Sequence, residues 1–558
     1  MISKMLQRSV LPALVLLISL TLAACGASNT TGVTSATPET IIETVTVKET
    51  VEVEKVVTAT PQPEEKTLII GMDIHSTSFD PANHFEVPSA VANFATYQQL
   101  VQITADNWHE PAPLLAESWD VSDDGLSYTF HLNPKAKFNS GNPVTAEDVR
   151  FSLMRLKNLQ GPPAYFLGQV DSIEAVDDLT VKITLTEPTT AFLQIMGVAY
   201  ASVYEAAVVK ENGGTDAEDA PTTDSATAYL DQHSPGSGPY ILTRWTPRYE
   251  VVLEKNPDYW GPAPKLDKII FRQVDDPTTA YQMLQRGDMD ILLNADKDLL
   301  EQAEANPDLN TLLLDTLDIR WVSMTCDPEL SKPLSDQRVR QAIAYALDRE
   351  GLMQAVEGGS GKAQPNILPV GMPGVDPAMT KARDLDKARS LLAEAGYGDG
   401  FDLELTYPTA INIPQMATKM QADLAEVGIN ATLVPLDFST LISKWYDSQE
   451  PEMYISMWVP DYVDLTAWTD FWGFNDHDYM WIARCDFPEI SQLSTDIRVK
   501  RDLETRAALS KEWQEKMMDA SFAIPLYQFT ELVIMRKEVS GFGYIPVKYT
   551  DLSLLDRE

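Results

Sequence analysis

The sequence predicts an α/β protein built from two or three lobes. The chain has 558 residues, which is more than a single hydrophobic core usually supports. Beyond residue 239, segments with the apolar spacing of helices alternate with short segments typical of strands, and this alternation favours an α/β architecture. The hydrophobic content of 44% and the aromatic content of 9% are those of a well-packed globular protein.

Three segments in the first third of the chain have the patterns of strands. Residues 68–72 form a short apolar run, as in a buried strand, whereas residues 126–132 and 179–185 alternate apolar and polar side chains, as in half-buried strands. Asp123-Asp124-Gly125 and Asp177-Asp178 supply residues that favour tight turns before the two alternating segments.

Helix signals follow in several places. Thr145 is a good N-cap with Asp148 three residues further on, so a helix is expected to begin at Ala146. The spacing of apolar residues predicts three later helices, over 336–349, 385–395 and 414–427. The last two end next to a glycine, which is typical of a helix C-terminus. Strands are expected over 429–436 and 453–459.

Residues 1–24 have the order of a secretory signal peptide. Lys4 and Arg8 form a basic start, an apolar run follows over 10–20, and small residues precede Cys25. A cysteine in this place resembles a bacterial lipobox, which implies cleavage before Cys25 and lipidation of that residue. The alternative is an uncleaved membrane anchor, but the apolar run is short for a spanning helix. We therefore expect an extracytoplasmic protein that is lipid-anchored to the cell membrane.

The segment over 25–66 is expected to be a flexible tether. It is rich in Thr, Val, Glu and Pro, a bias typical of linkers. Residues 43–54 alternate β-branched and polar side chains as a strand does, but the sequence offers no obvious partner strand. Folded sequence is expected to begin at residue 67.

Charge and cysteine content narrow the class of protein further. The formal net charge of −39 argues against nucleic acid and anionic lipid as partners, because like charges repel. Either solubility or attraction of cationic cargo accounts for this charge. Besides Cys25, the chain has Cys326 and Cys485, which either pair as a disulfide in an oxidising compartment or remain two buried thiols.

Five blocks of the chain carry a shared pattern. They are 115–132 with 145–149, 236–240 with 254–260, 338–349, 391–397 and 524–527. In this order they resemble the peptide- and nickel-type extracellular solute-binding proteins of ABC importers, which are family 5, cluster C, and in particular the dipeptide- and oligopeptide-binding kind. The resemblance implies a two-lobed periplasmic-binding-protein-like fold of type II, with an additional α+β domain inserted in the first lobe.

The resemblance also implies an order of domains and a way of working. The expected divisions are a signal peptide over 1–24, a tether over 25–66, the first lobe over 67–112 and 236–318, the inserted domain over 113–235, the second lobe over 319–500, and a return to the first lobe over 501–558. Ligand is captured in a cleft between two hinged lobes and delivered to a membrane permease, whose ATPase subunits supply the energy. We expect a monomer without a cofactor.

The segment over 445–481 is the candidate for ligand contact. It holds five of the 11 tryptophans and no Lys or Arg. Carboxylates beside aromatic rings suit a cationic group, because the carboxylate supplies charge and the ring face supplies cation–π attraction. In dipeptide- and oligopeptide-binding relatives, an aspartate just past a buried strand pairs with the ligand's α-ammonium. The resemblance of 458–464 to that segment places Asp461 in this role; the alternative is a turn residue or a helix cap.

Four neighbours of Asp461 are further candidates for the ligand site. They are Trp458, Tyr462, Asp464 and Trp468. Most tryptophans of the segment are expected to pack in the core, and only Trp458 and Trp468 are expected to line the cleft. Many relatives have a proline after the second aspartate, where this chain has Leu465. The alignment of this segment with the relatives therefore depends on that position.

Other functions remain open at this point. Aromatic richness also suits stacking on sugars, so an oligosaccharide-binding protein is the second hypothesis. A nickel or metal-chelate binder comes next, because the six histidines are scattered without the close pairs typical of metal sites. An extracytoplasmic hydrolase comes last, because the chain has neither a Gly-x-Ser-x-Gly nor a His-Glu-x-x-His motif. We expect a binding protein rather than an enzyme, with no resident metal.

Overall fold

The structure is a computed structural model that describes residues 41–45, 53–57, 65–409, 412–445, 451–475, 479–547 and 549–558. The chain divides into two compact units, residues 1–64 and residues 65–558. In the first unit, β1 (Ile41–Val45) pairs antiparallel with β2 (Val53–Val57). The alternating stretch therefore has a partner strand, contrary to the sequence expectation. The signal peptide, Cys25 and the rest of the expected tether lie outside the described residues.

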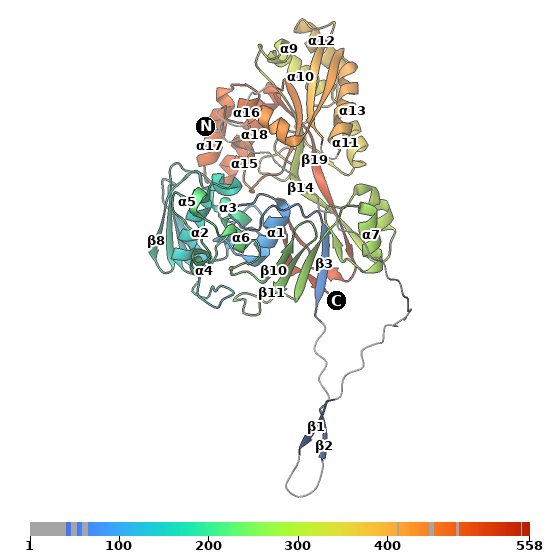
Figure 1. Ribbon diagram of the computed structural model, residues 1–558. Coiled ribbons are helices and arrows are strands. Elements are labelled where there is room, and N and C mark those ends of the chain that lie inside the picture. The colour runs from blue at the N-terminus through green and yellow to red at the C-terminus, as the bar shows by residue number, and fades with distance from the viewer. Residues whose placement is uncertain are drawn as a thin grey trace, which may run out of the picture. The chain divides into compact units, whose positions relative to one another are not determined.

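A mixed sheet of 11 strands runs through the second unit (Figure 1). Its order is β10-β11-β12-β3-β13-β19-β14-β18-β16-β17, with β15 paired to β19. The strands are β3 (Thr67–Met72), β10 (Tyr240–Thr246), β11 (Glu250–Lys255), β12 (Lys268–Gln273), β13 (Ile291–Leu292), β14 (Leu309–Met324), β15 (Lys362–Ala363), β16 (Phe401–Pro408), β17 (Ile429–Leu436), β18 (Met453–Trp458) and β19 (Ala523–Arg536). We call the part built on β3 and β10 to β13 the first lobe, and the part built on β16 to β18 the second lobe.

The first lobe contains both ends of the second unit. The strand β3 runs parallel to β12 in the register Leu68↔Ile269. Lys66 forms an ion pair with Asp556 at 3.2 Å. The other elements of this lobe are α1 (Val87–Thr96), β4 (Val101–Gln102), β5 (Ala112–Pro113), α7 (Pro277–Arg286), η3 (Lys297–Leu299), α8 (Leu300–Glu304), β20 (Val539–Ser540), β21 (Gly543–Ile545), β22 (Tyr549–Asp551), η5 (Leu552–Leu554) and β23 (Asp556–Arg557).

A separate antiparallel sheet of four strands, in the order β6-β7-β9-β8, follows in the sequence. Its strands are β6 (Ala116–Val121), β7 (Ser127–Leu132), β8 (Val170–Asp177) and β9 (Thr180–Leu185), and the helices of this region are α2 (Ala146–Leu159), η1 (Pro162–Leu167), α3 (Phe192–Ile195), η2 (Ala199–Ala201), α4 (Ala206–Glu211), α5 (Ala220–Thr223) and α6 (Thr227–Leu230). Every second residue of β7 and β9 is buried, as the alternation predicts. We call this region the inserted domain.

The helix α2 begins where the sequence predicts. The backbone N–H of Asp148 donates to Thr145 Oγ1, and the backbone N–H of Thr145 donates to Asp148 Oδ2. This reciprocal capping box satisfies two amides that have no partner within the helix. The predicted N-cap is therefore confirmed.

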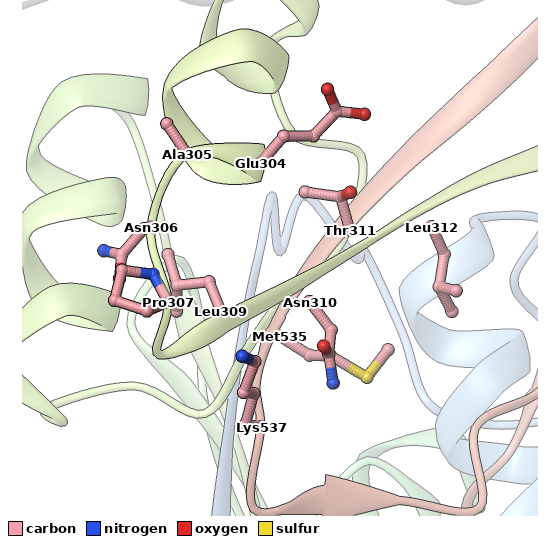
Figure 2. Close-up of a pocket in the computed structure, with 10 residues that line it drawn as sticks. All are labelled: Glu304, Ala305, Asn306, Pro307, Leu309, Asn310, Thr311, Leu312, Met535 and Lys537. Atoms are coloured by element: carbon pink, nitrogen blue, oxygen red, sulfur yellow. The ribbon is translucent and has the colours of Figure 1, made fainter.

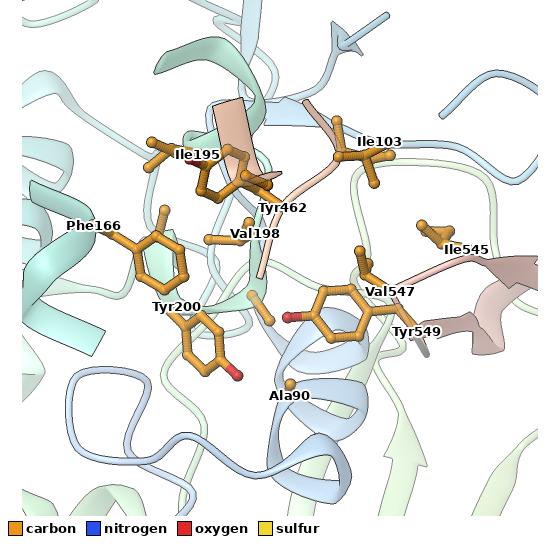
Figure 3. Close-up of a cluster of buried hydrophobic side chains, with 14 of the residues drawn as sticks. Ala90, Ile103, Phe166, Ile195, Val198, Tyr200, Tyr462, Ile545, Val547 and Tyr549 are labelled. Carbon is orange, nitrogen blue, oxygen red and sulfur yellow. The ribbon is translucent and has the colours of Figure 1, made fainter. Parts of the chain in front are cut away.

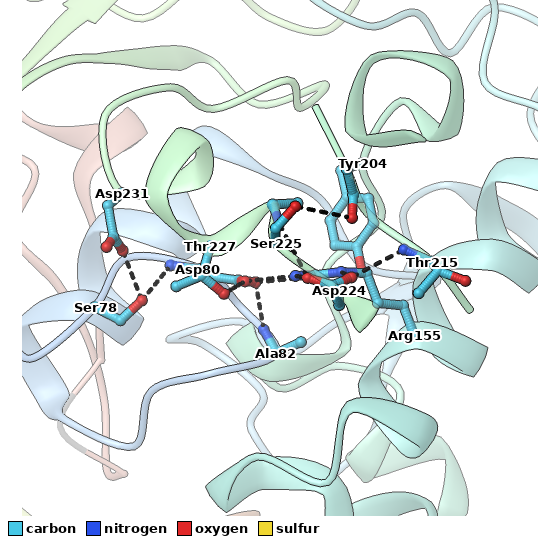
Figure 4. A network of polar contacts seen from close by, with 12 residues as sticks. Ser78, Asp80, Ala82, Arg155, Tyr204, Thr215, Asp224, Ser225, Thr227 and Asp231 are labelled. Carbon is cyan, nitrogen blue, oxygen red and sulfur yellow. Dashed lines mark hydrogen bonds and ion pairs between the residues drawn. The ribbon is translucent and has the colours of Figure 1, made fainter. Parts of the chain in front are cut away.

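Arg155 ties α2 to the first lobe through a buried ion network (Figure 4). Its guanidinium donates to both oxygens of Asp80, at 2.8 and 2.7 Å, and to both oxygens of Asp224, at 2.8 and 2.9 Å. Burial opposes ionisation of Asp80, but the charge and hydrogen bonds of Arg155 outweigh it and hold the pKa of that carboxyl below its usual value. Asp80 also accepts a hydrogen bond from Thr227. The network joins three chain segments at one point.

The second lobe packs helices against β16 to β18 around its own hydrophobic core. Its helices are α9 (Lys332–Ser335), α10 (Gln337–Ala346), α11 (Arg349–Glu357), α12 (Leu385–Glu394), α13 (Ile413–Ala425), α14 (Phe438–Ser443), α15 (Thr466–Thr469), α16 (Tyr479–Ile482), α17 (Pro488–Val499) and α18 (Leu503–Ala520). The helix expected over 336–349 is present as α10, but it ends at Ala346 because Leu347 is extended. The Asp348 side chain then caps the next helix, α11, by accepting from the Gly351 amide.

The strands β14 and β19 connect the two lobes (Figure 1). The first part of β14 pairs only with β19, near β13 of the first lobe, whereas its last part also pairs with β18 of the second. Between these parts the register shifts, first between Asp315 and Ile319 and again between Arg320 and Trp321. Such irregularities bend and twist a strand pair, and here they mark the passage from one lobe to the other.

The chain returns to the first lobe after α18. The helix α18 packs against α17 and α10 of the second lobe. The chain crosses back to the first lobe through β19, and the expected division at residue 501 stays a prediction. The side of α18 that packs in the second lobe has Trp513 and Met517 buried, together with Ser510 and Gln514.

Candidate ligand-binding site

Asp461 lies just beyond the end of β18, beside the place where the connecting strands bend. The strand β18 pairs antiparallel with β14 in the register Ile319↔Trp458, so its last residue adjoins the register shift of β14. Pro460 follows, and a proline cannot donate to a strand ladder. The chain leaves the sheet there and presents the Asp461 side chain to the inserted domain.

The Asp461 carboxylate is partly buried and has a tyrosine as its partner. The Tyr165 hydroxyl of η1 donates to Asp461 Oδ2 at 2.6 Å. Among the described residues, no basic side chain contacts Asp461. Burial raises the pKa of Asp461 to about 6, although the hydrogen bond from Tyr165 favours the ionised form. Burial and the neighbouring carboxylate raise the pKa of the Tyr165 hydroxyl well above its usual value, so this hydroxyl is the donor.

Aromatic rings surround this carboxylate. We call the rings of Phe85, Tyr165, Phe166, Tyr200 and Tyr462 the aromatic cluster. Its ring centroids lie 4.3 Å apart for Tyr165 and Phe166, 5.4 Å for Phe166 and Tyr200, and 5.2 Å for Phe85 and Tyr200. Tyr462 meets Phe166 edge to face at 6.4 Å. The cluster brings together rings from the first lobe, the inserted domain and the second lobe.

The apolar wall continues beyond the aromatic cluster, as Figure 3 shows. A cavity of about 10 Å³ lies between Tyr462 and Val463 of the second lobe and residues of the opposite side. That opposite side is made of Ile103, Gln194, Gly197, Val198, Ile545, Val547 and Tyr549. The two sides are thus nearly in contact, and a ligand at Asp461 requires them to separate.

This arrangement is suited to hold a cation. A carboxylate in an apolar surrounding gains more from an opposite charge than one in water, because the local dielectric is low. The ring faces add attraction for the same charge. A ligand that brings an ammonium group would restore the ionised form of Asp461.

The predicted tryptophans take different positions. Trp458 is half-buried and contacts Phe471 at 5.0 Å and Trp472 at 5.4 Å between ring centroids. Trp468 has 0% of its surface exposed. It packs edge to face on Trp458 at 5.7 Å. Trp468 packs in the core of this structure, because its helix α15 turns it inward. Its place in the ligand cleft stays a prediction. Tyr462 is 8% exposed and belongs to the aromatic cluster.

The Asp464 carboxylate has hydrogen-bond partners of its own. It accepts from both terminal nitrogens of Arg506 and from the Thr466 backbone N–H, within the second lobe. In this structure the Asp464 carboxylate is held by a buried guanidinium, and its contact with a ligand stays a prediction. Asp464 and Arg506 line a pocket of about 300 Å³, with residues of the inserted domain opposite.

A larger pocket, of about 530 Å³, lies on the first lobe (Figure 2). Glu304 to Asn310 line it from the end of α8 into β14, with Met535 and Lys537 opposite. It shares no residue with the site at Asp461. Among the described residues, no group of three or more His, Cys, Asp or Glu side chains is placed to hold a metal ion. Within the same residues, no helix is long and apolar enough to cross a membrane.

The two remaining cysteines form a disulfide. Cys326, just after β14, is bonded to Cys485, just after α16. Both lie in the second lobe. The sequence left a disulfide and two free thiols open, and the structure has the disulfide.

Sequence reasoning missed most of the aromatic cluster. Tyr165, Phe166, Phe85 and Tyr200 come from segments that lie far from Asp461 in the chain, and no spacing rule connects them to it. One local signal was present: Pro162 and Pro163 follow Gly161, shortly after the end of α2 at Leu159, and precede the aromatic pair Tyr165 and Phe166. Such a segment predicts a short turn that presents aromatic side chains, but not what they contact.

Two lobes joined by a strand pair, with a buried acidic site at their junction, define a solute-binding protein of the periplasmic type. The comparison with known families agrees. Residues 110–480 match the model of the bacterial extracellular solute-binding proteins, family 5. This match covers more than half of the chain, and the chain therefore belongs to that family.

Individual relatives resemble the chain over most of its length. The probable D,D-dipeptide-binding periplasmic protein DdpA of Escherichia coli is 28% identical over 489 residues, which cover 86% of this chain and 92% of that protein. The heme-binding protein A of Haemophilus influenzae is 27% identical over 525 residues, which cover 88% and 93%. Among solved structures, the DppA protein of Helicobacter pylori in complex with the peptide STSA is 26% identical, with a TM-score of 0.71 and coverage of 88% and 99%.

Proposed function

We propose that this chain is the lipid-anchored, peptide-binding component of an ABC importer. Peptides with a free amino terminus are captured between the two lobes, and the closed form delivers them to a membrane permease driven by its ATPase subunits. The chain acts as a monomer, without catalysis.

The observation that carries this proposal is the carboxylate of Asp461. It is partly buried, it contacts no basic side chain among the described residues, and the pKa near 6 means that it is mostly ionised at neutral pH. An uncompensated buried charge is costly. An ammonium at about 4 Å would contribute about 4 kcal/mol of attraction at the effective dielectric of a protein surface. Asp461 therefore gives an amino terminus a specific place to bind.

Among the ligands that carry an ammonium group, peptides are the class that the names of the relatives favour. The D,D-dipeptide-binding protein of Escherichia coli and the peptide complex of the Helicobacter pylori protein both point that way. The heme-binding relative points to another ligand. Heme carries carboxylates and no amine, so a buried aspartate would repel its charged groups rather than bind them.

Anchoring is supported by the sequence alone. The signal-like residues 1–24 and the small residues before Cys25 support export and lipidation. An anchored binding protein stays close to its permease, which raises the local concentration of loaded protein there.

Calorimetry on the purified protein tests the ligand class. We expect heat of binding with Ala-Ala, Ala-Phe and Gly-Leu, and none with their N-acetylated forms, because acetylation removes the ammonium group. Binding to cello- or manno-oligosaccharides, to a nickel chelate or to heme, without binding to the free peptides, would contradict the proposal.

Asp461→Asn tests the residue that carries the proposal. We expect this change to weaken peptide binding by about 2–5 kcal/mol, because it removes one partner of a buried charge pair. Asp171→Asn is the matched control: Asp171 lies exposed on β8, and the change also removes one negative charge. Equal affinities of the two variants would show that Asp461 does not hold the ligand.

A further inference from the structure

Tyr165 already occupies the carboxylate that the proposed ligand would need. Its hydroxyl lies 2.6 Å from Asp461 Oδ2, and a hydrogen bond of this length to an ionised acceptor belongs to the stronger ones in proteins. The nearby hydroxyl of Tyr462 accepts from the Thr466 hydroxyl at 3.3 Å, and the side-chain hydrogen bond that Asp461 receives comes from Tyr165. Tyr165 is thus the side-chain donor that the described residues supply to Asp461.

The backbone under Tyr165 is held in place. Gly161 precedes η1 and lies so close to the Ala82 carbonyl that a Cβ at this position would be 2.3 Å from its oxygen. Pro162 and Pro163 fix two backbone angles at the start of η1. The buried network of Arg155 holds α2, which leads into this turn, against the loop that contains Asp80. The segment therefore presents the tyrosine from a fixed base.

The side chain of Tyr165, in contrast, has room to move. It is 45% exposed, and Phe85, which it contacts at 6.1 Å between ring centroids, is 39% exposed. Phe166 and Tyr462, on the other side of the site, are 5% and 8% exposed and are packed in the core. A partly exposed side chain changes rotamer in nanoseconds or faster, and this change needs no movement of the backbone.

From this geometry we infer that Tyr165 is a built-in competitor of the ligand: its hydroxyl occupies Asp461 in the empty protein, and the incoming ammonium group must displace it. The inference rests on the proposed function, since it concerns the same carboxylate. Tyr165 is a specificity-determining residue, because only a group that binds Asp461 better than a phenol does can take its place. A neutral donor such as a sugar hydroxyl gains little binding energy when it replaces the Tyr165 hydroxyl, because it exchanges one hydrogen bond to Asp461 for another. An ammonium group gains an ion pair with the carboxylate.

Competition of this kind lowers the apparent affinity in a predictable way. The fraction of protein in which Asp461 is free multiplies the intrinsic affinity. A hydrogen bond to a charged group holds the competing state in a large excess. Removing the hydroxyl should therefore tighten ammonium binding, by about tenfold for a typical bond of this kind.

Tyr165→Phe tests the inference, with calorimetry at pH 7.5 and Ala-Phe as the probe. The change removes the hydroxyl and keeps the ring in the aromatic cluster. We expect Ala-Phe to bind about tenfold more tightly than it binds the unchanged protein. N-acetyl-Ala-Phe serves as the probe without an ammonium group, and we expect no gain for it.

Tyr249→Phe is the control variant, since Tyr249 is 54% exposed on the turn between β10 and β11 and also loses only a hydroxyl. An unchanged affinity in Tyr165→Phe would overturn the inference. A weaker affinity would overturn it as well, because it would show that the hydroxyl binds the ligand or supports Asp461 in the complex. Both outcomes leave the proposed function intact if the unchanged protein binds Ala-Phe, whereas failure of the unchanged protein to bind any free peptide overturns the two together.

Discussion

The side chain of Asp461 carries an energetic cost in the folded protein when it is ionised. Its pKa is about 6, whereas an aspartate has an ordinary value of 3.8. Because the folded state holds its proton more tightly, unfolding becomes easier as the pH rises through the interval between these two values. Above pH 6 the full cost applies, and the shift corresponds to about 3 kcal/mol. Sites that bind ligands often carry such a cost.

Asp461→Asn should therefore stabilise the ligand-free protein at neutral pH. An asparagine avoids the buried charge and still accepts the hydrogen bond from Tyr165. We expect a gain of up to about 3 kcal/mol at pH 7.5 and almost none at pH 4, where the aspartate is itself protonated in the folded state. Urea unfolding at the two pH values measures the difference. A gain of the same size at both values would show that charge burial is not its cause.

The resemblance to a known family singled out Asp461 as the candidate ligand contact. The composition of the segment alone would not have distinguished it from the other acidic residues. The segment from Trp445 to Trp481 offers several acids, and Asp464 looks as suitable as Asp461 in the printed sequence. Only the structure shows that Arg506 holds Asp464 and that no basic side chain contacts Asp461 among the residues described. The partner of a carboxylate is a tertiary property, and here the partner lies 42 residues away.

At the scale of elements, the position of η1 decides where Tyr165 points. Gly161 permits the turn to approach the loop at Ala82. Its φ of −67° is ordinary for any residue. The need for glycine is therefore one of space: a Cβ would lie 2.3 Å from a backbone oxygen, which cannot move without moving its loop.

Gly161→Ala should consequently shift η1 and lower the stability of the folded protein. We expect a loss of about 1–3 kcal/mol in the free energy of unfolding, as for other overpacked positions, and tighter binding of Ala-Phe, because the shift moves the competing Tyr165 hydroxyl away from Asp461. Gly398→Ala is the control, since a Cβ there would meet Ala393 at an ordinary 3.5 Å. Thermal unfolding and calorimetry on both variants measure the two effects. If Gly161→Ala behaved like the control, the close approach would not matter.

Element boundaries were predictable where local chemistry sets them. The capping box at Thr145 and the strand over 429–436 follow from nearest neighbours, and the structure confirms both. Burial of the tryptophans was not predictable, because an aromatic residue in a short helix packs equally well in a core or against a ligand. Trp458 and Trp468 look alike in the sequence, and only the fold around α15 separates them.

At the scale of the whole molecule, the disulfide is the longest covalent constraint. Cys326 and Cys485 are separated by 159 residues. In the chain-entropy model, closing a loop of that length stabilises the folded state by up to about 5 kcal/mol. The bond lies within the second lobe, so it constrains unfolding rather than the approach of the lobes.

Replacing both cysteines by serine should therefore lower stability and spare binding. We expect a clear fall in the melting temperature, measured by calorimetry, and an affinity for Ala-Phe at 25 °C close to that of the unchanged protein. Dithiothreitol should have the same effect on the unchanged protein and none on the variant. Loss of peptide binding at 25 °C in a variant that is still folded would place the disulfide in the ligand site instead.

The overall fold could be predicted from ordered sequence blocks, but the contact between the lobes could not. Tyr165 and Asp461 are 296 residues apart, and their meeting depends on how β14 and β19 bend. No local sequence pattern predicts the register of two paired strands at a bend. The return of the chain through β19 could not be predicted from the sequence either, because the buried positions of α18 include Ser510 and Gln514 beside Trp513 and Met517 and do not form a plain apolar face.

The meeting of Lys66 with Asp556 has a mechanical consequence. The unit over 65–558 begins and ends in the first lobe. The second lobe therefore contains neither end of this unit. A tether attached on the N-terminal side of residue 65 would exert its force on the first lobe alone. It would exert no force across the bend of β14 and β19 that joins the two lobes. A fluorophore pair that tests for motion between the lobes belongs on the two lobes, since labels near Lys66 and Asp556 would both sit on the first lobe, where these residues form an ion pair.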